Sequence, residues 1–216
     1  PDRAALEACA ARANDLMALS RERIADELLK LLALPEPVEA VRRMVERGIL
    51  RPVLPEIDEV AGLERLAEAE RTAGIAPSAV RRLAALLPAD PELASQVAAR
   101  LRLSKKAAKR LALAADRAIA APQRLAFRIG TESAIDRLLL AGQADPEVAA
   151  LHAWQPPRLP LSGGDLIAMG LVAGPVVART LKQVESEWEE AGFPADKAAV
   201  RAIARAAVDQ ALRENQ

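Results

Sequence analysis

The chain has few of the residues on which most enzyme active sites and extracellular folds depend. Its 216 residues include one cysteine, one histidine, two tryptophans, two phenylalanines and no tyrosine. The single Cys9 can form no internal disulfide, which is typical of a reducing compartment. One histidine and one cysteine supply too few ligands for a zinc site. No apolar run approaches the roughly 18 residues of a membrane span, and no basic-then-apolar leader signals export, so we expect a cytoplasmic protein with no membrane partner.

Motifs of nucleotide chemistry are also missing. There is no Gly-x-Gly-x-x-Gly or Walker loop, and no Asp-x-Asp pair of the kind that holds two metal ions for phosphoryl transfer. His152 has no serine or cysteine partner in a nucleophile motif, and we interpret it as a packing residue beside Trp154. Asp165, after two glycines, is interpreted as a helix cap. We therefore predict no catalytic residue, no metal site and no cofactor in this chain.

The residues that are abundant indicate helices. Alanine and leucine supply most of the 51% of hydrophobic residues and are good helix formers, whereas Ile, Thr, Tyr and Phe are scarce. We predict an all-α fold, with Ser20 and Ser104 capping two of its helices. The expected helices span residues 2–18, 20–32, 35–48, 58–72, 78–87, 91–102, 104–120, 122–141, 145–153, 164–170, 175–191 and 195–213.

Helical spacing of apolar residues predicts two buried stripes. One lies on the second helix and is expected to pack against the first: Ile24, Leu28 and Leu31. The other belongs to the helix predicted at residues 104–120 and consists of Leu103, Ala107, Leu111, Ala114 and Ala118.

The net charge of zero hides an uneven distribution. Residues 56–70 carry six acidic residues and one arginine, whereas residues 100–110 carry six basic residues and no acid. The basic segment is interpreted in two ways, as a face that follows RNA phosphates or as an ordinary solvated helix face. Only four residues are aromatic, so few side chains can stack on unpaired bases. We therefore expect the chain to recognise the shape and backbone of a folded RNA. The predicted RNA-binding residues of this segment are Arg102, Lys105, Lys106, Lys109 and Arg110.

A glycine-rich corner precedes the helix predicted at residues 175–191. Pro175 suits a first helical position, so the free N–H groups of Val176 and Val177 could attract phosphate, with Arg179 and Lys182 as further RNA contacts. Alternatively, the corner only lets two helices turn closely. In that case an apolar stripe faces the core, formed by Val177, Leu181, Val184 and Trp188. Both interpretations stay open.

Three segments, in this order, resemble one family. They are SRERIADELLKLL (20–32), PEPVEAVRRMVERGILRPVLPEI (35–57) and LPLSGGDLIAMGLVAGPVVARTLKQVESEW (159–188). Together they are similar to the C-terminal half of bacterial class II tRNA nucleotidyltransferases, the CCA-adding enzymes, and of their relatives the poly(A) polymerases. The resemblance implies neck helices at 1–33, an RNA-binding body at 34–155 and a smaller C-terminal tail subdomain at 156–216. Glu22, Arg23 and Glu27 match the neck pattern and would brace the helix that reads the incoming base.

The resemblance also implies what lies outside this chain. Members of the family carry a Gly-Ser strand motif, an Asp-x-Asp pair and a Glu-Asp-x-x-Arg helix in an N-terminal catalytic head, and none of these occurs here. We therefore expect a part of such an enzyme that holds tRNA or another structured RNA and adjoins that head. Mg²⁺ and CTP or ATP are expected for the full-length enzyme, and CCA addition, A addition and poly(A) tailing stay open. The alternative is a helical scaffold or dimerisation module without an RNA partner.

Overall fold

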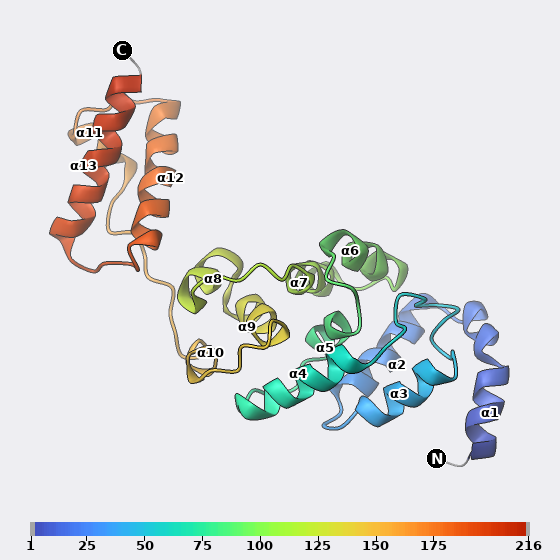
Figure 1. Cartoon of the computed structure of the whole chain (residues 1–216). Coiled ribbons are helices and arrows are strands. Elements are labelled where there is room, and N and C mark those ends of the chain that lie inside the picture. The colour runs from blue at the N-terminus through green and yellow to red at the C-terminus, as the bar shows by residue number, and fades with distance from the viewer. Residues whose placement is uncertain (1–2, 215–216) are drawn as a thin grey trace. The chain divides into compact units, whose positions relative to one another are not determined.

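The fold is entirely helical, as the composition predicts. A computed structural model describes residues 3–214, and this part of the chain forms thirteen α-helices and one 3-10 helix without any strand (Figure 1). The chain divides into two compact units, Pro1–Trp154 and Gln155–Gln216. We call them unit 1 and unit 2 and describe each by itself.

Unit 1 contains α1 to α10. Two serine caps are confirmed, because the Ser20 Oγ accepts from the Arg23 N–H at 3.3 Å and the Ser104 Oγ accepts from the Ala107 N–H at 3.2 Å. The elements are α1 (Arg3–Ala11), η1 (Ala13–Ala18), α2 (Arg21–Ala33), α3 (Val38–Glu46), α4 (Ala61–Thr72), α5 (Ala79–Ala85), α6 (Pro91–Arg100), α7 (Lys105–Ala115), α8 (Pro122–Ile129), α9 (Thr131–Leu140) and α10 (Pro146–Ala150).

Most predicted helices are shorter in the structure, and three of them break or end at a polar residue or a glycine. The helix predicted at 2–18 breaks at Arg12, whose Nε donates to the Asp15 carboxylate at 2.7 Å. The helix predicted at 104–120 ends at Ala115, because the Asp116 carboxylate accepts from the Ala118 N–H at 2.9 Å and forms a turn. Ala118 is therefore exposed, and its place in the buried stripe was wrong. The helix predicted at 122–141 is divided at Gly130, where φ is +85°.

The core of unit 1 joins α2 to the helices that follow it. Leu28 is buried as predicted, but Ile24 and Leu31 are only partly buried, and the buried face continues through Ala25 and Leu32. This face packs mainly against α5. Leu16, near the end of the segment predicted as the first helix, also packs against the same cluster. The segments assigned to neck and body thus share one hydrophobic core.

A close approach of α4 to α5 requires glycine. A Cβ at Gly62 would lie 2.1 Å from the carbonyl oxygen of Ala85, a distance that no side chain tolerates. The backbones of the two helices therefore touch, and this contact sets the positions of Glu70 on α4 and of Arg81 and Arg82 on α5.

Unit 2 consists of α11 (Gly163–Ala168), α12 (Pro175–Glu190) and α13 (Lys197–Glu214). The predicted stripe of α12 faces the core, with Val184 and Trp188 buried and Val177 and Leu181 partly buried. A Cβ at Gly163 would lie 3.0 Å from the Val177 Cγ1, so the glycine permits close packing of α11 on α12. The apolar stripe expected for a tight corner therefore faces the core.

Asp165 caps the start of α11, as predicted. Its carboxylate accepts from the Ser162 N–H at 2.8 Å and from the Ser162 hydroxyl at 2.7 Å. The hydrogen bond from the Ser162 hydroxyl, reinforced by that from the N–H, lowers the pKa of Asp165 below its ordinary value. The carboxylate therefore serves the helix start.

Candidate nucleic-acid interface

Three lysines form a basic face on α7. Lys105, Lys106 and Lys109 are exposed, and no ion pair joins any of them to another residue of the described chain. The opposite side of the helix is held by Leu111 and Ala114, which are fully buried. Lys105 and Lys106 also lie in the first turn, where the positive end of the helix dipole makes a cation unfavourable for folding. We call these three residues the lysine face.

The arginines of the same segment have other partners. Arg100 forms two hydrogen bonds with the Glu56 carboxylate at 2.7 and 2.9 Å. Arg102 contacts Glu22 on α2 at 2.7 Å. Arg110 is held by Asp136, with contacts at 2.5 and 2.8 Å. The six cations that appear continuous in the sequence are therefore divided between ion pairs and a free face.

These ion pairs shift the pKa values of their carboxylates. The hydrogen bond from Arg100 lowers the pKa of Glu56, and the hydrogen bond from Arg102 lowers the pKa of Glu22. Both carboxylates are ionised at neutral pH. Neither side chain of a pair is thus available to a ligand without giving up its partner.

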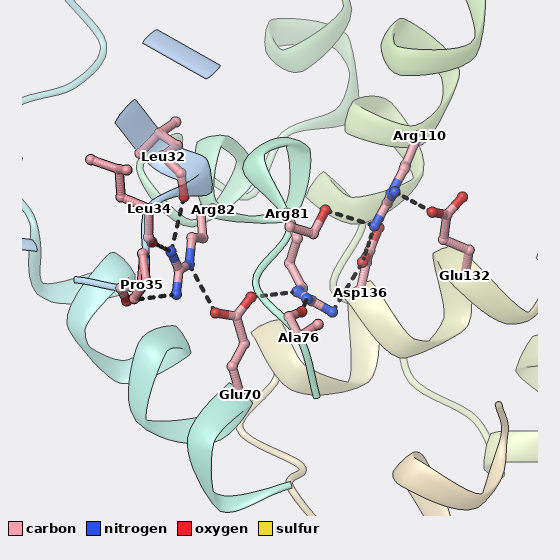
Figure 2. A network of polar contacts seen from close by, with 11 residues as sticks. Leu32, Leu34, Pro35, Glu70, Ala76, Arg81, Arg82, Arg110, Glu132 and Asp136 are labelled. Carbon is pink, nitrogen blue, oxygen red and sulfur yellow. Dashed lines mark hydrogen bonds and ion pairs between the residues drawn. The ribbon is translucent and has the colours of Figure 1, made fainter. Parts of the chain in front are cut away.

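Arg110 belongs to a buried polar network, shown in Figure 2. Glu70 lies between two arginines, with its oxygens 2.9 Å from the Arg81 Nε and 2.8 Å from the Arg82 Nε. Asp136, which is fully buried, lies 3.5 Å from Arg81 and accepts from Arg110. Buried charges are costly unless they are paired, and here each of the charged groups has an opposite partner.

Arg82 connects the network to the end of α2. Its guanidinium donates to the carbonyl oxygens of Leu32 at 2.9 Å and of Pro35 at 3.4 Å, and also to that of Leu34 (Figure 2). The last carbonyl groups of a helix have no partner within it, and a buried arginine supplies several donors in a fixed geometry. The network therefore fixes where α2 ends relative to α4 and α5.

The predicted contacts of unit 2 are exposed but weakly supported. Arg179 and Lys182 both lie on the solvent side of α12. The N–H of Val177 bonds to the Gly174 carbonyl at 3.1 Å, so the prediction that this group is free was wrong. Gly170 and Gly174 at the corner adopt positive φ, and Arg179 and Lys182 stay predictions.

The predicted brace residues of α2 take different positions. Glu22 pairs with Arg102, and Glu27 pairs with Lys30 at 2.8 Å. Arg23 and Glu27 line an apolar groove of ≈ 460 Å³ between η1, α2, α3 and the loop after α3. Most of its lining is aliphatic and includes Leu16, Leu19, Ile24, Leu28, Leu31 and Leu54.

His152 does not pack in the core, so that interpretation was wrong. Its side chain is exposed and lines a polar pocket that Arg110 and Asp136 also line. Within residues 3–214, no group of three or more His, Cys, Asp or Glu side chains is placed to hold a metal ion. No helix of this range is both long enough and apolar enough to cross a membrane.

Sequence reasoning missed some candidate residues. Arg47 and Arg51 are exposed at and after the end of α3, and within the described chain no ion pair engages them or Arg23. The sequence did carry a signal for Arg47 and Arg51, because neither has an acidic residue three or four positions away. The pairing of Glu70 with two arginines had no signal, because it joins residues on different helices.

The comparisons with known proteins support an RNA partner. Residues 1–60 match the family described as the probable RNA and SrmB-binding site of polymerase A. A search of the curated proteins found no significant match. The start of the chain, through the loop before α4, is therefore similar to an RNA-binding region of the polymerase A type. The lysine face lies outside the matched residues but adjoins them, since Arg102 beside it contacts Glu22.

Proposed function

We propose that this chain holds tRNA or a similar folded RNA for an enzyme that adds CCA or A residues to RNA 3′ ends. The observation that carries the proposal is the lysine face, three exposed cations that form no ion pair with any described residue, beside the segment that matches an RNA-binding family. Cations placed against the helix dipole reduce the stability of α7, and an anionic ligand offsets that loss.

The chemistry of the face favours backbone contacts. An ammonium group is a compact point charge that suits phosphate oxygens but carries no planar pattern for reading base edges. Aromatic residues for stacking are scarce, with two tryptophans and two phenylalanines in the whole chain. Trp188 is buried, which leaves even fewer for single-stranded bases. The face therefore fits a folded RNA recognised by its shape.

The groove beside α2 gives the proposed catalytic head a place to bind. Leu19, which is 46% exposed, lines it, and exposed apolar surface of this kind marks an interaction site. Arg23 and Glu27 place a positive and a negative charge in the groove lining, and charged side chains of a neighbouring helix could pair with them. The head would then rest on α2, whose end the Arg82 contacts fix to α5.

Nucleotide transfer is assigned to that head. Mg²⁺ and CTP or ATP belong to its chemistry in this proposal, and no step of the transfer is assigned to residues of this chain. Unit 1 contributes position, because an RNA end held in a fixed geometry reacts as though its concentration were greatly increased. Which nucleotides are added is a property of the head.

The salt dependence of tRNA binding tests the proposal. Replacing Lys105, Lys106 and Lys109 together by glutamine should weaken binding and make the slope of log K against log salt less steep by roughly two to three. The fold should be retained because Leu111 and Ala114 lie on the other side of α7. Circular dichroism and urea unfolding check that the variant remains folded.

A double variant in unit 2 is the control. Arg179→Gln with Lys182→Gln removes two exposed cations from α12. We expect a smaller change in affinity and slope than with the lysine triple. If the triple variant binds tRNA as the unchanged chain does, the lysine face is not the RNA surface, and a helical scaffold without an RNA partner becomes the better account.

A further inference from the structure

Arg102 occupies a helix end where this chain otherwise uses glycine. After α6, the Arg102 N–H bonds to the Ala99 carbonyl at 3.0 Å and the Leu103 N–H bonds to the Ala98 carbonyl at 2.9 Å. This pair of bonds is the Schellman motif, and it puts Arg102 in the left-handed region with φ +52°.

The other helix ends of this type show what the backbone prefers. Within the described residues, five more helices, α3, α4, α9, α11 and α12, end with the same two bonds. The position that corresponds to Arg102 is a glycine with positive φ in each of them: Gly48, Gly74, Gly142, Gly170 and Gly192. At the end of α12 the next residue, Phe193, also has positive φ, at +59°. A residue with a Cβ is strained in this conformation, so a glycine at position 102 would be the more stable choice. The side chain of Arg102 must therefore have another use.

The contact of Arg102 with Glu22 does not explain this residue choice by stability alone. The two side chains meet at 2.7 Å but are 67% and 50% exposed. Ion pairs this exposed contribute little to folding because water and salt screen them. The position is more informative: Arg102 lies in the short corner between α6 and α7, three residues before Lys105, the first residue of the lysine face.

We propose that Glu22 holds Arg102 away from the RNA, so that the ion pair is a latch that limits how tightly the lysine face binds. This inference rests on the proposed RNA-binding function. While Glu22 is ionised and paired with Arg102, only the three lysines contact the RNA. When Glu22 is neutralised or engaged elsewhere, Arg102 joins them as a further phosphate contact. The latch favours release of the RNA.

Replacement of Glu22 by glutamine tests the latch. Glu22→Gln keeps the shape of the side chain and removes the charge that holds Arg102. The dissociation constant for a tRNA transcript should fall, and the salt slope should steepen by roughly 0.7–0.9, the amount expected for one added phosphate contact. The matched control is Glu27→Gln, which removes the same charge from the same helix but frees Lys30 instead of Arg102.

Arg102→Gly, alone and combined with Glu22→Gln, completes a double-mutant cycle. In the Glu22→Gln background it should abolish the gain in affinity, and it should cost more affinity there than in the unchanged chain. It should also raise the stability of the chain in urea, because the strain at position 102 is relieved. An unchanged slope for Glu22→Gln, an equal gain for Glu27→Gln, or a gain that survives Arg102→Gly would each overturn the latch.

The latch and the proposed function fail in different ways. If the lysine triple variant loses tRNA affinity while Glu22→Gln leaves the slope unchanged, the lysine face stands and only the latch is wrong. If the triple variant binds as the unchanged chain does, the RNA surface itself is wrong.

Discussion

The positive charges of unit 1 fall into two groups that the structure treats in opposite ways. Arg81 and Arg82 have side chains only 3% and 2% exposed, and both bind Glu70. Lys105, Lys106 and Lys109 are exposed and pair with no described residue. Arginine suits the interior because its planar group makes several directed hydrogen bonds, whereas the ammonium group of lysine is strongly hydrated. Arg81 and Arg82 hold helices together, whereas Lys105, Lys106 and Lys109 are available to a ligand.

Breaking the interior group should have the largest effect. Glu70→Ala leaves two buried guanidinium groups without their shared carboxylate and frees the end of α2 from α4. We expect a loss of about 3–5 kcal/mol in the free energy of unfolding, the usual result of removing one partner from buried charges. Urea unfolding followed by circular dichroism measures it.

A neighbour on the same helix is the control for that change. Glu68→Gln removes an exposed carboxylate that, among the described residues, pairs only with Arg71 and Thr72 on the surface of α4. Its unfolding free energy should stay within about 0.5 kcal/mol of the unchanged chain. Equal losses for the two variants would show that burial of the network adds nothing.

The partly exposed ion pair of Glu56 and Arg100 should have a smaller, pH-dependent effect on the free energy of unfolding. The Glu56 side chain is 14% exposed and that of Arg100 is 34% exposed. The hydrogen bond from Arg100 lowers the pKa of Glu56 in the folded state. The contribution of this ion pair to folding stability is therefore complete above the ordinary pKa of about 4.3 and is lost as the pH falls through the lowered value.

The change to glutamine isolates that contribution. At pH 7, Glu56→Gln should cost at most about 1 kcal/mol, since the pair is partly screened. The difference from the unchanged chain should shrink as the pH is lowered below about 4. A difference that grows on acidification would contradict the assigned direction of the pKa shift.

Sequence patterns predicted the parts of the fold that depend on local interactions. The all-α class, the caps at Ser20 and Ser104 and the packing stripe of α12 follow from propensity, hydrogen bonds within one turn and helical spacing. Helix ends were less predictable where a short polar side chain competed for the backbone. The turn made by Asp116 ends α7 early although the apolar spacing continues to Ala118.

Contacts between distant segments had no local signal. The stretch RLRLSKKAAKR looks like one basic face, yet its arginines bind Glu56, Glu22 and Asp136, at separations of 44, 80 and 26 residues. Only a fold places these carboxylates opposite the arginines. For the same reason the sequence predicted the lysine face but could not separate it from Arg102 and Arg110.

The adjacent residues Lys109 and Arg110 give the most direct test of this division. Each is replaced by glutamine, and the unfolding free energy and the salt slope of tRNA binding are measured for both. Lys109→Gln should leave stability within about 0.5 kcal/mol and make the slope less steep by roughly 0.7–0.9. Arg110→Gln should lower stability by about 1–3 kcal/mol, because it takes donors from the buried Asp136, and should leave the slope unchanged. If Arg110→Gln changes the slope as Lys109→Gln does and costs no stability, the two residues form one RNA-binding face and the division is wrong.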